Sequence, residues 1–230
     1  MTPATAWRAL WASCVVLSAC APRRGALRLR GVEVSLRGGY QTFARSGGDA
    51  FVPDPPGSAH TPGQGFRGGP SLDLDVGLRL GPRWALGLGV GHGWLWPAAP
   101  SPSLASREVA VWRLGVFARL HLRPVWTAAS VDPWISAGVD PLARFVESSA
   151  SDRLRVDAVV HAVSVPVTAG LDVRVSGGLA LGLYVGVAAW LSIAGCAEAH
   201  TDVGTSAQCG GGLAHNGWLF GGATARYLFR

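Results

Sequence analysis

Residues 71–80 read SLDLDVGLRL, and this alternation decides the fold that the sequence predicts. Leucine or valine occupies every second position, while the positions between them include Asp73, Asp75, Gly77 and Arg79. Successive side chains of a β-strand point to opposite faces, so the pattern predicts a strand with one apolar and one polar face. A helix would instead distribute these charges around its circumference.

The same period of two recurs along most of the chain. Further strands are predicted near residues 30–41, 84–96, 113–122, 135–145, 159–173, 179–193 and 218–229. Long polar connectors at 44–69, 97–106, 147–157 and 194–216 alternate with shorter ones at 81–83, 124–133 and 176–178. This rhythm is typical of consecutive hairpins with all long loops at one end. The predicted fold class is therefore all-β, an eight-stranded antiparallel up-and-down transmembrane β-barrel.

The polar face of these segments favours a membrane barrel over a soluble one. A soluble barrel turns its charged face to water, but here that face has few charges and many glycines. Its six arginines and five acids would allow a closed interior to pair its own charges. Aromatic residues near the strand ends, such as Trp84 and Trp94, are typical of interface girdles. The predicted interior charge network consists of Glu33, Arg37, Asp73, Asp75, Arg79, Arg113, Arg119, Asp140, Arg144, Asp172 and Arg226.

A helical alternative exists for residues 175–197, which are long enough to span a bilayer as a helix and carry no charge before Glu198. The alternation of large apolar residues with Gly or Ala in this stretch favours a strand. The sequence also holds no second span of this kind.

Composition excludes two classes of protein. Of 230 residues, 49% are hydrophobic and only 15% charged, whereas disordered chains combine low hydrophobicity with high charge. The net charge is +6, but the arginines are spread along the chain with no run longer than Arg23-Arg24. Nucleic-acid binding normally needs basic residues clustered on one face, so no nucleic-acid partner is predicted.

The N-terminus has the features of an export signal. One basic residue, Arg8, precedes an uncharged stretch that is too short to cross a membrane. The stretch ends in Leu17-Ser18-Ala19-Cys20, which resembles the bacterial lipobox, in which the cysteine is lipidated. Ordinary cleavage after Ala21 is the alternative. The predicted organisation is a signal peptide at 1–19, lipidation at Cys20, a linker at 20–26 and the barrel at 27–230.

Two cysteines, Cys196 and Cys209, remain in the exported part beyond the signal. An even pair in an exported chain predicts a disulfide. A metal site with His200 and His215 is the alternative, but the spacing matches no common zinc pattern. No metal site is therefore predicted.

Taken together, these features resemble the OmpA/OmpX-type outer-membrane β-barrels of Gram-negative bacteria. The resemblance rests on the signal peptide, eight alternating segments and alternating connector lengths. The last residues, Ala225-Arg226-Tyr227-Leu228-Phe229-Arg230, are similar to the family's C-terminal assembly signal, although Arg230 follows the final Phe229. The resemblance implies localisation in the bacterial outer membrane.

Catalytic chemistry has little support in the sequence. No nucleophile elbow, phosphate-binding loop, metalloprotease motif or dinucleotide fingerprint occurs, so we predict no catalytic residues and no cofactor. Some members of the resembled family modify lipid A with a His, a Ser and an acidic residue. His92 and His161 lie on the apolar face, but Ser164 falls on the face opposite His161.

The function expected is a non-enzymatic outer-membrane barrel that anchors in the envelope or interacts with the surroundings through four long external loops. Its expected partners are outer-membrane lipid and an unidentified extracellular ligand, and the protein is expected to be a monomer. The alternatives are a small porin-like channel, a lipid A-modifying barrel enzyme, and a periplasmic lipoprotein whose soluble β-barrel binds an apolar ligand.

Overall fold

The computed structural model describes residues 29–47, 66–97, 106–123, 131–150 and 154–229. The predicted signal peptide at 1–19, the linker at 20–26 and Cys20 lie outside the described residues. So do most of the first long connector and part of the second.

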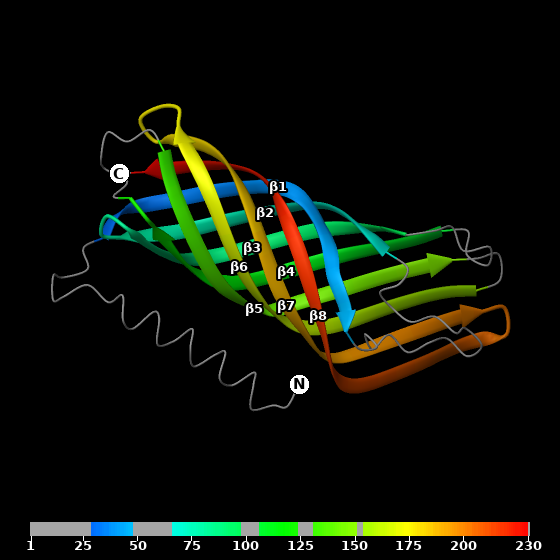
Figure 1. Ribbon diagram of the computed structural model, residues 1–230. Coiled ribbons are helices and arrows are strands. Elements are labelled where there is room, and N and C mark those ends of the chain that lie inside the picture. The colour runs from blue at the N-terminus through cyan, green and yellow to red at the C-terminus, as the bar shows by residue number, and fades with distance from the viewer. Residues whose placement is uncertain (1–28, 48–65, 98–105, 124–130, 151–153, 230) are drawn as a thin grey trace.

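Eight antiparallel strands close into a barrel in simple sequence order, with β1 paired to both β2 and β8 (Figure 1). The strands are β1 (Leu29–Gly47), β2 (Phe66–Leu80), β3 (Trp84–Pro97), β4 (Ser106–His121), β5 (Val131–Ala150), β6 (Leu154–Arg174), β7 (Leu179–Thr201) and β8 (Gly204–Phe229). The predicted all-β, eight-stranded up-and-down barrel is confirmed. Closure matters because it leaves no unpaired sheet edge within the barrel wall.

The two ends of the barrel differ. One, which we call the turn end, contains the tight β2–β3 turn at 81–83, the β6–β7 turn at 175–178 and Phe229. At the opposite end, β7 and β8 form a hairpin, the ribbon, which extends past β1 and stays paired along β7 with β6 as far as Thr201 (Figure 1). We call this the ribbon end. β7 and β8 have 23 and 26 residues, whereas β3 has 14.

Two connector predictions are wrong at the ribbon end. Residues 194–216 were expected to be a long loop, but they form the paired ends of β7 and β8, joined by a tight turn after Thr201. Residues 147–157 are also mostly strand, because β5 runs to Ala150 and β6 begins at Leu154. Both stretches are polar and 194–216 is also rich in glycine, so both resemble loops, but backbone ladder bonds do not depend on apolar side chains.

The helical alternative for residues 175–197 is wrong, because β7 covers most of that stretch. No helix in the described ranges is long and apolar enough to cross a membrane.

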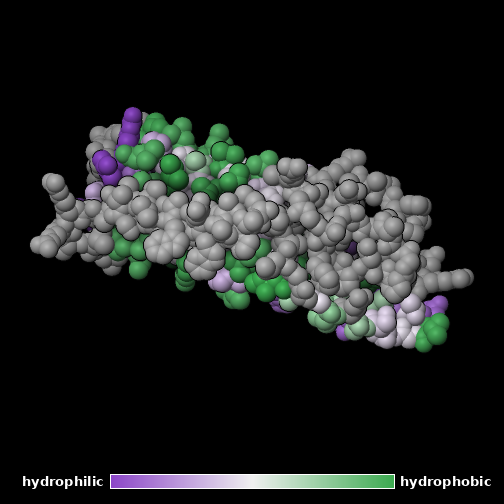
Figure 2. Space-filling model, turned by 60° about the horizontal axis from the view of Figure 1, so that its bottom comes forward, coloured by the Kyte–Doolittle hydropathy of each residue, from purple (hydrophilic) through white to green (hydrophobic). Residues whose placement is uncertain are grey.

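The outer face of the barrel is apolar. Leucines such as Leu88, Leu142 and Leu183 expose 61–70% of their surface, and green apolar patches are prominent on the coloured part of the outer surface (Figure 2). A continuous apolar surface of this kind suits hydrocarbon and not water. The soluble alternative requires an apolar interior and a charged outer face, and the structure has the opposite arrangement.

Glycines on the inner face make room for charged side chains. A Cβ added at Gly91 would collide with the carboxylate of Asp73 and lie 3.0 Å from Nε of Arg113. One added at Gly182 would collide with the carboxylate of Asp172. Eight strands leave an interior only wide enough for side chains, so small residues opposite large charged ones keep the packing possible.

Candidate functional site

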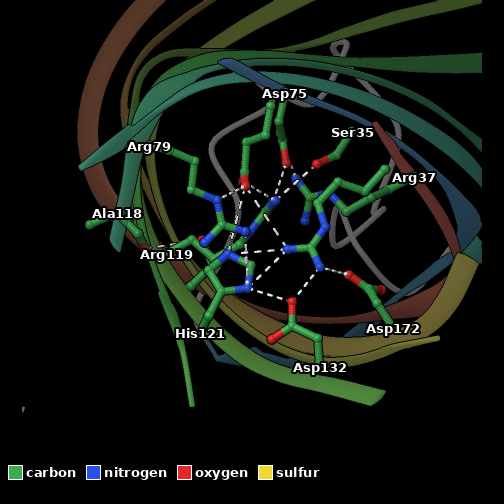
Figure 3. Close-up of polar contacts among 12 residues, drawn as sticks. Ser35, Arg37, Asp75, Arg79, Ala118, Arg119, His121, Asp132 and Asp172 are labelled. Carbon is green, nitrogen blue, oxygen red and sulfur yellow. Dashed lines mark hydrogen bonds and ion pairs between the residues drawn. The ribbon is translucent and has the colours of Figure 1, made fainter. Parts of the chain in front are cut away.

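The most extensive polar cluster of the described chain fills the barrel near the turn end (Figure 3). Arg119 of β4 lies at its centre and donates hydrogen bonds to Glu33 at 2.8 Å and to Asp75 at 2.7 Å. It also donates to the hydroxyl oxygen of Ser35 at 2.9 Å. Its guanidinium stacks 4.7 Å from the ring centroid of Trp134. These contacts connect β1, β2, β4 and β5 across the lumen.

A second guanidinium, that of Arg226 on β8, completes this cluster. It forms ion pairs with Asp132 and with Asp172, the latter at 2.9 Å. His121 lies between these groups, with Nδ1 2.7 Å from Asp132. Arg79 pairs with Glu33 at 2.8 Å. Burying an ionised side chain without a partner costs free energy. The mutual pairing therefore allows this cluster of ionised side chains to lie inside one small barrel.

Asp132 was missed by the sequence prediction, which placed it in the connector at 124–133. β5 begins at Val131, so Asp132 belongs to the strand and points inward. The signal was available, because Asp132 has the same parity as the predicted inward residues Ser136, Gly138 and Asp140. Polar residues before a strand resemble a turn. The pairing of Asp132 with Asp172 on β6 shows that Asp132 belongs to the strand.

Midway along the barrel, a second group of charges borders a cavity of about 40 Å³. Arg37 donates to Asp75 at 3.0 Å, and Arg113 donates to Asp73 at 2.6 Å. All four residues and Asp140 line the cavity. A water needs roughly 10–15 Å³ of such space, so the cavity has room for about three or four waters.

Toward the ribbon end, aromatic residues replace the charges. Trp190 and Trp218 are each 2% exposed, with ring centroids 5.5 Å apart, and Phe145 packs 4.6 Å from Trp190. Phe220 and Tyr184 lie next to this group on β8 and β7. We call these five residues the aromatic plug. They fill the lumen with side chains at a level where an open channel would hold water.

Arg144 lies outside the barrel, and the prediction that it joins the interior network is wrong. Its side chain is exposed, whereas Ala143 beside it is 1% exposed. The cause is a register shift in β5 between Asp140 and Ala143, which leaves Pro141 and Leu142 both facing outward. A bulge inserts one extra residue and so reverses the parity of every later position in the strand.

The other ten predicted network residues face the interior. With Arg144 removed and Asp132 added, the charge network has five arginines and six acids, where the sequence analysis expected six and five. The acids are Glu33, Asp73, Asp75, Asp132, Asp140 and Asp172, and the arginines are Arg37, Arg79, Arg113, Arg119 and Arg226.

The two histidines considered for lipid chemistry do not form a catalytic group with Ser164. His161 is exposed on the outer face, whereas Ser164 is fully buried on the inner face of the same strand. The ring of His92 lies between those of Trp94 and Trp112, with centroids 4.1 and 4.0 Å away. These ring contacts give His92 a packing role in the outer aromatic girdle. Among the described residues, no group of three or more His, Cys, Asp or Glu could hold a metal ion.

The ribbon is closed by a disulfide between Cys196 and Cys209, which confirms the predicted pairing. The two cysteines are directly opposite each other in the β7–β8 ladder. Beyond them the ribbon is exposed, and Val203 at its tip has 98% of its surface accessible. Beside the ribbon, the Ser148 hydroxyl donates to Asp157 at 2.6 Å, and this bond, with help from Arg155, lowers the pKa of the Asp157 carboxyl.

The comparison with known proteins gives information about the fold. No family model matches the sequence, and no curated protein matches it. Among solved structures, the barrel is similar to a major outer membrane protein from Thermus thermophilus, with a TM-score of 0.53 and 13% identity over 87% of this chain and 100% of that one. Neisserial surface protein A aligns with a TM-score of 0.48 and 14% identity, over 88% of this chain and 99% of that one.

The fold is thus that of the outer-membrane β-barrels, as the closed eight-stranded ring and its apolar outer face already indicate. The predicted resemblance to OmpA/OmpX-type eight-stranded barrels is confirmed at the level of fold. An identity of 13% carries no information about ligand or activity.

Proposed function

We propose that this protein is a non-enzymatic, non-conducting anchor in the bacterial outer membrane that displays its disulfide-closed ribbon for interaction outside the cell. The single observation that carries the proposal is the filled interior. Paired charges occupy the turn end, and the aromatic plug occupies the level toward the ribbon end. A barrel filled in this way provides rigidity and position, and leaves recognition to the segments that project from it.

The ribbon is the segment best suited to recognition. It extends the barrel wall beyond the apolar outer face on continuously paired strands, with β6 beside β7 as far as Thr201, so its tip has a defined position relative to the membrane. Its disulfide cross-links β7 and β8 in this extension, where β8 no longer pairs with β1. Outer-membrane barrels have short turns on the periplasmic side and longer segments outside, so the ribbon end faces the exterior in this proposal.

The same proposal includes export and anchoring at the N-terminus. Residues 1–19 act as the signal peptide, and Cys20 becomes the lipidated first residue of the mature protein. The mass of the mature N-terminal peptide tests this directly, since lipidation at Cys20 and plain cleavage after Ala21 produce different peptides. An integral barrel needs no lipid anchor, so a Cys20→Ala variant remains in the membrane.

A small channel is the second candidate, and the water-sized cavity beside Asp73 and Arg113 is the observation in its favour. Conductance in planar bilayers separates the two functions. We expect no steady current steps from the wild-type barrel. The Trp190→Ala/Trp218→Ala variant is the matched positive control, because it removes the two largest side chains of the plug. Steady steps of equal size from both proteins would contradict the proposed non-conducting anchor.

A further inference from the structure

Arg144 is a cation on the otherwise apolar outer face of the barrel. Its side chain is exposed on the outside of β5, two residues from Leu142, which exposes 66% of its surface. None of the described carboxylates forms an ion pair with it. An arginine on the lipid-facing side of a barrel is destabilising unless it lies near the interface and finds a polar partner there.

The residues on either side of Arg144 are polar or aromatic. In the ladder, Arg144 is directly opposite Trp112 on β4 and His161 on β6. Directly opposite residues have Cβ atoms roughly 4.5–5.5 Å apart, so these side chains can reach the same small ligand. Trp112 in turn contacts His92 on β3, with ring centroids 4.0 Å apart. A row of four such residues therefore crosses four adjacent strands on the outer face.

Arg144 lies near the boundary between hydrocarbon and water at the ribbon end. Toward the turn end, the outward neighbours are apolar, as at Leu114 and Leu142. Toward the ribbon end, Val146 comes first and polar residues follow, with an exposed Glu108 and the hydrogen-bonded pair of Ser148 and Asp157. Tryptophan side chains on membrane proteins gather at the depth of the lipid headgroups. Arg144 thus lies at the depth where phosphate groups of lipids are found.

We propose that Arg144 and His161, flanked by Trp112, bind the phosphate of a lipid headgroup in the leaflet at the ribbon end. The planar guanidinium can donate two parallel hydrogen bonds to phosphate oxygens, and the imidazole N–H can donate another. Trp112 provides an apolar wall that meets the upper part of the acyl chains. This assignment goes beyond the anchoring function, because it names a specific lipid site on the barrel wall and does not depend on what the ribbon binds.

A lipid fits this site better than a protein partner does. Arg144 continues directly into the apolar surface below it, so its ligand must be anionic at one end and apolar at the other. A phosphorylated lipid in the surrounding bilayer has this chemistry and is always present next to the site. A soluble anion would pair with the guanidinium of Arg144 but would make no contact with the neighbouring leucines.

The test compares retention of a phosphorylated lipid by matched variants. Wild-type protein, Arg144→Gln and Arg83→Gln are each folded in phosphatidylcholine vesicles that contain a minor fraction of lipid A. They are then extracted in mild detergent and analysed by native mass spectrometry. Arg83→Gln removes the same charge from an exposed arginine in the turn between β2 and β3. A shift in gel mobility between boiled and unboiled samples verifies that each barrel is folded.

We expect Arg144→Gln to retain lipid A about tenfold less than wild type, because a hydrogen bond to a charged group contributes an amount that corresponds to roughly that ratio. His161→Asn should show a smaller loss, and Arg83→Gln should match wild type. Equal losses in Arg144→Gln and Arg83→Gln would overturn the proposal, since they would indicate unspecific charge attraction.

Two further arms identify the ligand. Lipid A without phosphate groups should be retained no better by wild type than by Arg144→Gln, and equal retention of both lipid forms by wild type would overturn the phosphate assignment. Millimolar inorganic phosphate should displace little lipid A, because it lacks acyl chains. Full displacement would mean a general anion site and not a lipid site.

Discussion

Arg119 on β4 and Glu33 on β1 meet across the lumen at 2.8 Å, although 86 positions separate them in the sequence. Both side chains are almost completely buried, at 2% and 1% exposure. Glu33 also forms an ion pair with Arg79, and Arg119 also donates to Asp75, so each ion has two partners. This arrangement determines how the barrel interior responds to substitution.

Replacing Arg119 with methionine should strongly destabilise the folded barrel. The variant leaves the buried carboxylates of Glu33 and Asp75 with fewer partners, and breaking a buried pair in this way costs about 3–5 kcal/mol. Unfolding in urea, followed by tryptophan fluorescence in lipid vesicles, measures the loss. Arg155→Gln is the control, because it removes an exposed ion pair with Asp157 and should cost about 1 kcal/mol or less. Equal losses in both variants would contradict the structural role of the network.

Gly91→Ala should destabilise the barrel although it adds one methyl group. That methyl would collide with the carboxylate of Asp73 and crowd Arg113, so the pair must move or separate. Crowding of a packed interior costs about 1–3 kcal/mol. The same substitution at Gly177, in the β6–β7 turn with open space around it, is the matched control. The free energy of unfolding should fall for Gly91→Ala and stay near wild type for Gly177→Ala.

Removal of the disulfide should loosen the ribbon and leave the barrel intact. Cys196 and Cys209 lie beyond the level of the aromatic plug, so the Cys196→Ser/Cys209→Ser variant keeps the packed interior unchanged. A cross-link closing a loop of this size contributes about 3 kcal/mol in the chain-entropy model, and the residues inside that loop all belong to the ribbon. Amide hydrogen exchange should accelerate between these positions and remain slow in β2 and β3. Faster exchange throughout the barrel would show that the ribbon supports the whole fold.

The proposed orientation predicts which end reacts from outside the cell. In intact cells, a membrane-impermeant maleimide should label Val203→Cys at the ribbon tip, where the side chain is 98% exposed. It should label Arg83→Cys, in the turn between β2 and β3, only after the outer membrane is permeabilised. Labelling of Arg83→Cys alone in intact cells would place the ribbon in the periplasm and would refute surface display.

Much of the charged interior could be read from the sequence, because a strand with a period of two assigns each residue to a face without knowledge of its neighbours. Arg119, Glu33 and Asp75 all follow directly from alternation within their own strands. Their partners could not be deduced in this way. The ion pair of Arg226 with Asp172, for example, depends on the register in which β7 pairs with both β6 and β8.

Where alternation is interrupted, the sequence misleads. One extra residue near Pro141 moves Arg144 from the interior to the lipid-facing side, and nothing in the local pattern signals that shift. The ribbon was misread for a related reason, because Gly, Ser and polar residues resemble a loop unless a partner strand is known. Its pairing becomes evident only when Cys196 and Cys209 lie opposite each other.

The sequence alone determined the all-β class, the number of strands, the apolar outer face and the charged lumen. These properties depend on side-chain periodicity, which is a local property of the chain. The tertiary structure alone decided the bulge at β5, the ribbon, the inclusion of Asp132 and the packing of Trp190 against Trp218. Each of these depends on the register between strands, and register is set by contacts between residues that are distant in the sequence.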